Sequence, residues 1–419
     1  MTVARHSTEF SFRLMAVFLT SVASGLPLLL SSQTLQAWFT QAGVGLVSIG
    51  ALSLVSLPYV LKFLWAPMMD KYALFSSDRR KGWLYLTQIF LVITLLLMSL
   101  LSPQKHVFVL SVLALCLAFF SASQDVVVDG YRVDILDAKE RGLGASAQLL
   151  GYRLGMLLAG SLAIVIAAQY GWRVSYCCMA CLLLALFAYT FFLPVSPVSK
   201  CRAEWGRFSL LLPYQAIFFR KNSVIIVAVV LMYKMSDNMV FNLNMVFLLR
   251  HMHFSLLEVG AISNVVSVIG MLLGGVVAGA AMYRLTLYRS LVIFGWLQLL
   301  SHLGYVWLAL AGKSMSVMAV SFFLENFCGG MATVAFVAFL TSLCDKQFSA
   351  SQYALWSVVM SLPRVVLGPV TAWLVSVIGW VDFYALSCLA GLPALYLIWY
   401  LKKADRKSGS GSVFGAASL

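Results

Sequence analysis

The sequence predicts an all-α integral membrane protein, on the evidence of its composition, its hydropathy and the length of its apolar segments. Hydrophobic residues make up 62% of the 419 residues and charged residues only 11%, whereas a soluble globular protein is about 45–50% apolar and about 25% charged. The mean hydropathy is +0.92. A compact soluble fold has too large a surface for so few polar side chains, so soluble enzymes, nucleic-acid-binding domains and disordered chains are excluded.

About twelve segments along the chain have the length of a membrane span, which needs about 20 predominantly apolar residues. The expected spans are 12–39, 45–69, 82–102, 106–131, 143–168, 172–194, 222–249, 255–282, 286–311, 315–343, 350–378 and 380–401. The first is expected to be an uncleaved helix rather than a signal peptide, because its apolar run continues past Ala23 and Ser24 to Phe39.

Basic residues are distributed unevenly between the loops. If the N-terminus lies in the cytoplasm, the inner segments carry 20 Lys and Arg residues and the outer loops carry four. Lys and Arg are concentrated in cytoplasmic loops, so we expect a multi-pass protein of a bacterial inner membrane with both termini cytoplasmic. The same distribution accounts for the net charge of +14, which therefore does not point to a nucleic-acid partner.

The longest interruption of the apolar pattern is a basic, proline-containing stretch, residues 195–221. It predicts an N-terminal six-helix bundle (1–194), a cytoplasmic linker (195–221), a C-terminal six-helix bundle (222–401) and a cytoplasmic tail (402–419) that includes a Gly/Ser run typical of linkers. Arg153 and Arg364 lie 211 residues apart, close to the offset between the two halves. This spacing is consistent with an internal repeat.

Two six-helix halves joined by a basic linker form the layout of major facilitator transporters. The segment 70–81 resembles the acidic and basic loop between the second and third helices of that superfamily, in a lengthened form. The resemblance implies a conformational-gate loop that contains Asp70, Arg79 and Arg80, in a protein expected to act as a monomer.

Nine ionisable residues are expected at the depth of the bilayer, where each costs roughly 2.5–3.5 kcal/mol to insert. They are Lys62, Arg132, Arg153, Lys234, Arg364, Asp125, Asp129, Asp237 and Glu325. Asp125 and Asp129 are four residues apart on one helix face, so their charges repel and one tends to hold a proton. A proton-coupled carrier needs such a group. The alternative for Asp129 is an ion pair with Arg132 or Arg153.

The second half contains a comparable set. Lys234 and Asp237 are three residues apart, within reach of an ion pair that could be only structural. Glu325 has no basic residue close in sequence and is a candidate protonation site. Arg153 and Arg364, as fixed positive charges, suit an anionic substrate because guanidinium binds carboxylate in a fork. For Arg153 a structural clasp with the acids of the fourth span is the alternative.

Uncharged polar side chains accompany these charges. The first span contains Gln33 and Gln36, and aromatic hydroxyls occur at Tyr152 and Tyr233. They fit a cavity for a hydroxyl-rich, amide-bearing solute, although such groups also hold membrane helices together.

Motifs for ATP use, metalloprotease or serine-hydrolase chemistry are missing from the sequence. We expect no cofactor and no metal site, and a protein that is not an enzyme. A membrane-embedded acyl transferase is the alternative from another class, and it would need a histidine beside an aspartate. His302 is the only histidine deep in a span, and it is expected to be packed.

Several longer motifs resemble the AmpG family of muropeptide permeases over about residues 12–400. They are Ala23–Pro27 with Leu35–Phe39, Lys62–Pro67 with Asp70, Ser121–Asp129, Glu140–Gly142 with Leu150–Met156, Tyr233–Lys234 with Asp237, Phe323–Gly330 and Phe348–Ala350. One departure is that larger relatives carry two C-terminal helices beyond the twelfth.

The resemblance implies a proton-driven importer of anhydromuropeptides, which are GlcNAc-anhydroMurNAc-peptides, for peptidoglycan recycling and thereby for β-lactamase induction. Its partners would be protons, the lipid bilayer and an anionic sugar-peptide. By this resemblance, the polar intramembrane positions of the family fall on Gln124, Asp125, Asp129, Arg153, Lys234, Asp237, Glu325 and Arg364. Together with the residue patterns above, we expect proton coupling by Asp125, Asp129, Asp237 and Glu325. We expect substrate binding by Gln33, Gln36, Gln124, Tyr152, Arg153, Tyr233, Lys234, Asn326 and Arg364. An importer of a siderophore or a short peptide is the alternative within the superfamily.

Overall fold

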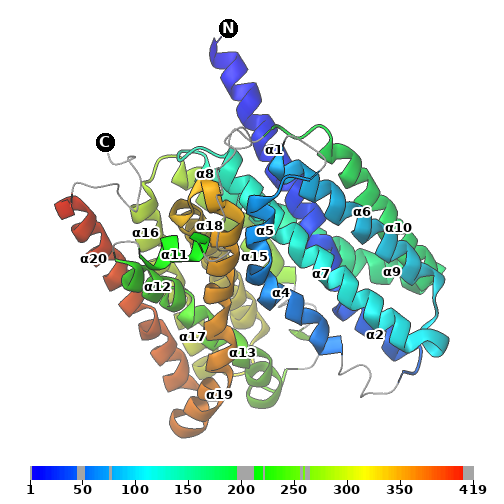
Figure 1. The fold of residues 1–419 in the computed structure, drawn as a ribbon. Coiled ribbons are helices and arrows are strands. Elements are labelled where there is room, and N and C mark those ends of the chain that lie inside the picture. The colour runs from blue at the N-terminus through cyan, green and yellow to red at the C-terminus, as the bar shows by residue number, and fades with distance from the viewer. Residues whose placement is uncertain are drawn as a thin grey trace. The chain divides into compact units, whose positions relative to one another are not determined.

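The computed structural model describes residues 2–44, 52–74, 78–195, 212–219, 222–254, 258–259 and 265–408. These residues form helices and turns without a strand (Figure 1). The first half contains α1 (Thr2–Leu30), α2 (Gln33–Gln41), α4 (Leu57–Leu61), α5 (Ala66–Lys71), α6 (Arg79–Leu100), α7 (Pro103–Ile135), α8 (Arg141–Leu157), α9 (Ala163–Tyr170), α10 (Trp172–Thr190) and α11 (Leu212–Phe218). The second contains α12 (Ser223–Met232), α13 (Met235–Val246), α15 (Val265–Met282), α16 (Leu287–Ser301), α17 (Leu303–Ala311), α18 (Met315–Leu343), α19 (Ser349–Ala390) and α20 (Leu392–Ser408).

The chain divides into two compact units that do not follow its order strictly. Unit 1 comprises Met1–Leu136, Ala147–Gln215 and Cys344–Leu355, and unit 2 comprises Asp137–Ser146, Ala216–Leu343 and Trp356–Leu419. Helices α8 and α19 therefore each contribute residues to both units. The short segment Cys344–Leu355 is the part of the second half that belongs to unit 1.

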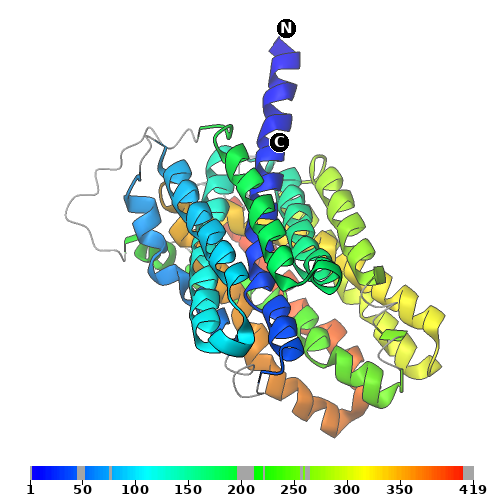
Figure 2. The ribbon, with the colours of Figure 1, turned by 90° about the vertical axis from the view of Figure 1, so that its right-hand side faces the viewer.

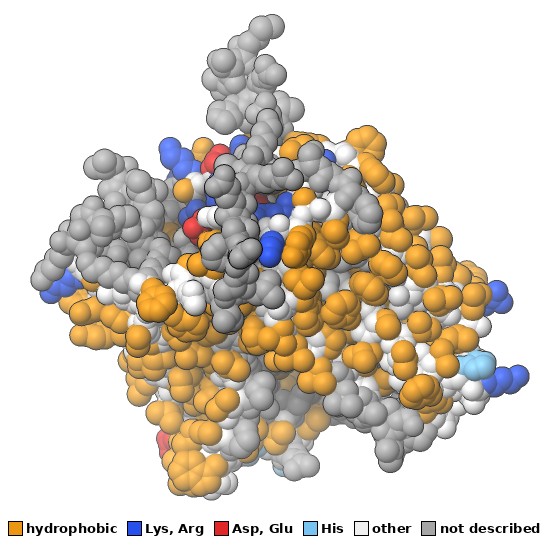
Figure 3. All heavy atoms as spheres, in the orientation of Figure 1, with side chains coloured by type: hydrophobic (Ala, Val, Ile, Leu, Met, Phe, Trp, Pro, Cys, Tyr) orange, Lys and Arg blue, Asp and Glu red, His pale blue; other side chains and the backbone are white. Residues whose placement is uncertain are grey.

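Ten helices in the described part of the chain are long and apolar enough to cross a membrane. The two other expected spans lie in 45–69, whose described residues form short turns and helices, and in the first part of α19. Large apolar side chains such as Phe108, Trp373 and Leu310 are 79%, 64% and 70% exposed, and hydrophobic atoms cover most of the face in Figure 3. Such a surface is stable only against lipid.

Helix α1 ends earlier than the predicted span 12–39, because the chain turns at Ser31 and Ser32 before α2 begins. Both serine hydroxyls donate to the carbonyl oxygen of Leu28, at 3.0 and 2.7 Å. Pro27, inside α1, has no N–H to donate to the helix. These local bonds compete with helix continuation, which explains the break.

Gly379 separates the last two predicted spans within α19. Its φ of +79° lies in the left-handed region that side chains rarely adopt. The predicted boundary between 350–378 and 380–401 falls at this residue. A sequence position without a side chain thus determines where the eleventh span ends.

Unit 1 is built around α6, which packs against α7 and α10 (Figures 1 and 2). Its core contains fully buried Leu91, Leu95 and Leu117 with Tyr176. In unit 2 the closest helix pair is α15 and α18. Membrane helices approach this closely through small residues, and here Gly274 and Gly330 provide the space.

Gly274→Ala is expected to lower the stability of unit 2, because a Cβ atom at this position would lie 2.0 Å from the carbonyl oxygen of Phe327 on α18. Overpacking of this kind costs about 1–3 kcal/mol. A lower melting temperature in detergent is the expected result. Val276→Ala, on the same helix but 52% exposed, is the control and should melt close to the wild type. Equal melting of both variants would contradict the close packing.

Candidate functional site

Asp125 and Asp129 lie one turn apart on α7 in unit 1, and both are buried, at 8% and 7% exposure. Their partners differ. The Ser24 hydroxyl on α1 donates to Asp125. Asp129 accepts from Gln148 Nε2 at 2.8 Å and from Arg132 Nη2 at 3.4 Å. Asp129 is therefore held in an ion pair, whereas Asp125 has a neutral hydrogen-bond donor.

Lys62 is the cation that both acids share. It is 8% exposed, and its ammonium group interacts electrostatically with Asp125 and with Asp129. Tyr152 on α8 is close enough to interact with both acids and with its neighbour Arg153. One cation thus faces two carboxylates, an arrangement that protonation of either acid would change.

Gln124, beside Asp125 on α7, is fully buried, and neither atom of its amide has a hydrogen-bond partner among the described residues. A buried amide without partners is unfavourable, so this one indicates a site for water or a ligand. Gln33 and Gln36 lie on α2, where Gln33 is exposed and Gln36 is half-buried. No described contact joins these two glutamines to the acids of α7.

Asp70 and Arg80 were expected in a loop, but they lie in α5 and in the first turn of α6, and they form a buried cluster in unit 1. Arg80 is fully buried and donates to Asp70 Oδ1 at 2.7 Å, to Asp134 Oδ2 at 2.9 Å and to Ser349 Oγ at 2.6 Å. Ser349 donates to the other oxygen of Asp134 at 2.6 Å. Arg79 lies beside them, 3.7 Å from Asp134.

Asp70 also caps the beginning of α19. Its carboxylate accepts from the backbone N–H groups of Ala350 at 3.3 Å and Ser351 at 2.7 Å, and from the Ser351 hydroxyl. The first N–H groups of a helix have no partner within the helix and carry a partial positive charge. The Asp70 carboxylate therefore joins the beginning of α19 to α5.

A further contact in unit 1 comes from α11, which lies within the predicted linker. The Tyr214 hydroxyl donates to the carbonyl oxygen of Phe63. Burial, with the nearby charge of Asp70, raises the pKa of Tyr214 above its usual value. Its hydroxyl is therefore a donor across the physiological range.

In unit 2 the helix predicted for 222–249 is broken at Tyr233 and Lys234, between α12 and α13. Lys234 Nζ binds Asp237 Oδ2 at 2.6 Å, with 15% and 18% of these side chains exposed. The predicted pair is therefore present. Tyr233 donates to the carbonyl oxygen of Leu291 at 3.0 Å and stacks on Phe336.

Glu325 on α18 belongs to the same group of charges. It accepts from Asn326 Nδ2 at 2.7 Å and hydrogen-bonds the Tyr305 hydroxyl. It also interacts electrostatically with Lys234 and Asp237. The structure thus brings together three of the predicted ionisable groups of the second half. Arg364 is in α19, but its side chain lies outside the described residues.

Sequence reasoning missed several partners of these groups. They are Ser24, Asp134, Gln148, Gln298, Tyr305, Ser349 and Ser351. His302 was expected to be packed, and it is fully buried, but its Nε2 lies 3.7 Å from Asp237 Oδ1. Asp134 could have been noticed as an acid at the end of an apolar run. The others carry no signal, because serine, glutamine and tyrosine are common in membrane helices.

The described residues contain no group of three or more His, Cys, Asp or Glu side chains placed to hold a metal ion. The chemistry available at both clusters is instead proton binding by carboxylic acids and recognition of anions by lysine and arginine.

Comparison with known proteins agrees with this arrangement. Residues 10–366 match the Major Facilitator Superfamily. The chain is 42% identical to the anhydromuropeptide permease of Escherichia coli (strain K12), over 90% of this chain and 77% of that protein. It is 32% identical to a Haemophilus influenzae protein, over 98% of this chain and 100% of that protein.

Solved structures are similar at the level of the fold. The fucose:proton symporter FucP of Escherichia coli is 11% identical with a TM-score of 0.69, covering 93% of this chain and 98% of that chain. The proton:xylose symporter XylE is 13% identical with a TM-score of 0.63, covering 94% and 96%. From these matches, the chain belongs to the Major Facilitator Superfamily and, within it, to the family of the anhydromuropeptide permease of Escherichia coli.

Proposed function

We propose that this protein is a proton-coupled importer of anhydromuropeptides that works by alternating access. The observation that carries the proposal is the 42% identity to an anhydromuropeptide permease over 90% of the chain. Relatives this similar over nearly the whole length usually keep the substrate class. The buried acids and cations of both units are the groups that such a carrier requires.

The proton-coupling role rests on Asp125 and Glu325. Asp125 is buried and Glu325 is half-buried, and the described hydrogen-bond partners of both are uncharged: Ser24 for Asp125, and Asn326 with Tyr305 for Glu325. Protonation of such an acid removes a buried charge without breaking an ion pair. Asp129 and Asp237 would instead assist the proton coupling, because each already forms an ion pair, with Arg132 and Lys234 respectively.

Substrate binding is assigned to groups that suit an anionic sugar-peptide. Lys234 and Arg153 supply positive charge, and the unpaired amide of Gln124 supplies a donor and an acceptor. Asn326, Tyr152 and Tyr233 add further polar contacts. Gln33, Gln36 and Arg364 complete the proposed set on the basis of the sequence.

The cluster of Asp70, Arg79 and Arg80 is the proposed conformational gate. Its support is that one buried arginine and one helix-capping carboxylate hold the first residues of α19. Release of those bonds would free α19 to move during transport. We further propose an inner-membrane location with both termini in the cytoplasm, and a monomer as the working unit.

Uptake of a radiolabelled anhydromuropeptide tests the proposal. The protein is expressed in bacteria that lack their own permease, and uptake is measured with and without a protonophore. We expect uptake that depends on this protein and collapses with the proton gradient. The absence of uptake would overturn the substrate assignment, and uptake that persists with the protonophore would overturn the coupling.

A further inference from the structure

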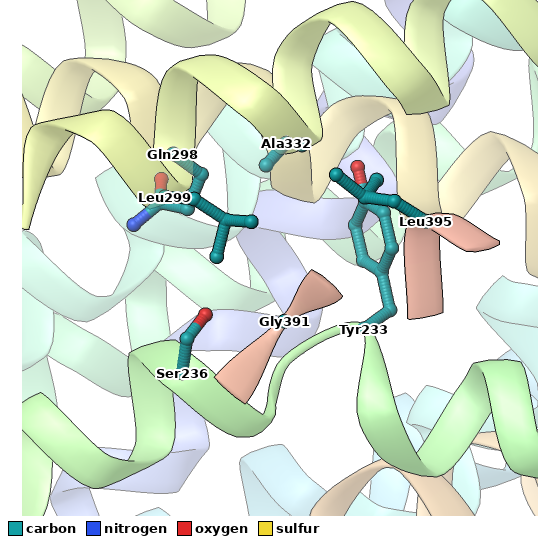
Figure 4. A pocket seen from close by; sticks show the side chains of 8 residues that line it. Tyr233, Ser236, Gln298, Leu299, Ala332, Gly391 and Leu395 are labelled. Carbon is teal, nitrogen blue, oxygen red and sulfur yellow. The ribbon is translucent and has the colours of Figure 1, made fainter. Parts of the chain in front are cut away.

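Unit 2 contains a small cavity, and of the residues assigned above to substrate binding it is lined by Tyr233. Its volume is about 10 Å³, roughly the room that one water molecule needs. It lies between Tyr233 and Ser236 on one side and Gln298 and Leu299 on the other, with Gly391 between them (Figure 4). Figure 4 shows the Ser236 hydroxyl pointing into this space.

Two polar atoms at the cavity have no hydrogen-bond partner among the described residues. They are Ser236 Oγ and Gln298 Oε1, on side chains that are 1% and 3% exposed. Glycines adjoin both atoms: a Cβ at Gly391 would lie 3.4 Å from Ser236 Oγ, and a Cβ at Gly329 would lie 3.2 Å from Gln298 Oε1. A buried water makes two to four hydrogen bonds, and Ser236 Oγ and Gln298 Oε1 are two partners at this cavity.

The polar contacts continue from the cavity to the ion pair of α13. Gln298 Nε2 lies 3.3 Å from His302 Nε2, and His302 Nε2 lies 3.7 Å from Asp237 Oδ1. Asp237 Oδ1 has no hydrogen-bond partner in the described part of the chain, while Asp237 Oδ2 binds Lys234. Asp237 thus has Lys234 on one oxygen and the histidine near the other.

We propose that the cavity holds one water molecule. We also propose that His302 is a positioning residue, which hydrogen-bonds Asp237 when the ion pair between Lys234 and Asp237 breaks. Gln298 Nε2 carries hydrogens and lies 3.3 Å from His302 Nε2, so the neutral ring has its own hydrogen on Nδ1 in this structure. Donation to Asp237 Oδ1 requires the other tautomer, in which Nε2 gains a proton and Nδ1 releases one. Gln298 Nε2 then turns from the ring to the water. The water is needed because it gives the Gln298 amide a hydrogen-bond partner both before and after Asp237 exchanges Lys234 for His302.

This exchange gives Lys234 freedom to bind a substrate carboxylate, and in that respect it rests on the proposed function. Without a second partner, Asp237 would become a buried, uncompensated charge each time Lys234 moved away. The charged groups that interact with His302 are Asp237 on α13 and Lys234, which precedes that helix, and the ring also hydrogen-bonds the backbone of Ser387.

Chemical labelling of lysines in the full-length protein tests the exchange without any substrate. An amine-reactive reagent is applied in detergent, and the rate at Lys234 is followed by mass spectrometry. We expect His302→Phe to slow labelling at least fivefold, because Asp237 then keeps Lys234. His302→Gln, which retains a donor, should restore labelling to within about threefold of the wild type. Lys313, with 47% of its side chain exposed, is the internal control.

A structural role for His302 predicts the opposite result. Loss of packing would loosen unit 2 and accelerate the labelling of Lys234, so an unchanged or faster rate in His302→Phe overturns the exchange. Adding Asp237→Asn to His302→Phe should release Lys234 and restore labelling. If the wild type takes up no anhydromuropeptide, the proposed function fails while the labelling rates still decide the exchange.

The water is tested separately by an experimental density map at a resolution that shows ordered solvent. We expect a peak within hydrogen-bond distance of Ser236 Oγ and Gln298 Oε1, and its loss in Ser236→Ala. Ser301→Ala is the matched control. The Ser301 hydroxyl donates to the backbone carbonyl oxygen of Gln298 at 2.7 Å, and Ser301 does not line the cavity. An empty cavity in the wild type would overturn this part of the proposal.

Discussion

Asp125→Asn is expected to abolish uphill accumulation of substrate while leaving exchange across the membrane partly intact. Asparagine has the shape of the protonated acid and can still accept from Ser24, but it cannot release a proton. The carrier would therefore still change conformation with substrate bound. Coupling to the proton gradient would be lost.

The size of the effect follows from the energy of the coupled proton. One charge moving through 100 mV releases about 2.3 kcal/mol, enough for a concentration ratio of roughly 50. Protons that only offset the charge of the substrate do not add to this ratio. Each further coupled proton lets the wild type sustain a ratio of this size, and in the variant the concentration ratio should fall to about 1. Proteoliposomes with an imposed gradient measure accumulation, and preloaded vesicles without a gradient measure exchange.

Two further variants make this test specific. Glu325→Gln is expected to behave like Asp125→Asn, because it also neutralises an acid that has uncharged hydrogen-bond donors. Asp382→Asn removes a carboxylate that is exposed and should leave accumulation unchanged. Accumulation by Asp125→Asn at the wild-type level would show that this acid does not carry the coupled proton.

Arg80→Met is expected to destabilise unit 1 strongly and to abolish transport. The substitution leaves Asp70 and Asp134 as buried carboxylates whose main cation is gone, since Arg80 donates to both and is fully buried. Breaking a buried ion pair from one side costs roughly 3–5 kcal/mol. The melting temperature in detergent and the uptake rate are the two measurements.

Three further variants separate the effect of the Arg80 charge from that of its hydrogen-bond geometry. Arg80→Lys keeps the charge but not the fork that contacts Asp70, Asp134 and Ser349 together, so it should recover part of the stability. Adding Asp134→Asn to Arg80→Met removes one unpaired charge and should raise the melting temperature again. Lys71→Met, at the last residue of α5 and outside the cluster, is the control. Wild-type melting of Arg80→Met would refute the importance of the cluster.

Much of the fold could be predicted from local sequence properties. Apolar segments of sufficient length specify membrane helices because lipid cannot hydrogen-bond an exposed backbone. The predicted boundary after residue 378 coincides with Gly379, where φ is +79°. The span 315–343 agrees with α18 at both ends. These features depend on residues close together in the chain.

The breaks inside the predicted spans were harder to predict. The interruption at Ser31 and Ser32 depends on hydroxyl groups that turn back to the carbonyl of Leu28. The break at Lys234 occurs beside a salt bridge within the same segment. An apolar pattern reports how much of a segment can enter lipid, and it does not report whether every backbone hydrogen bond inside it is kept.

The sequence by itself determined the class of the protein, its superfamily layout and the identity of the buried charges. Insertion of charge into lipid is so costly that a carboxylate or lysine in an apolar segment is noticed without a structure. Only the tertiary structure decided which partner each charge has. Ser24 and Asp125 are 101 residues apart, and Asp70 and Ser351 are 281 apart. Such pairs form because helix packing brings particular helix faces together. No local pattern in a single sequence indicates which faces will meet.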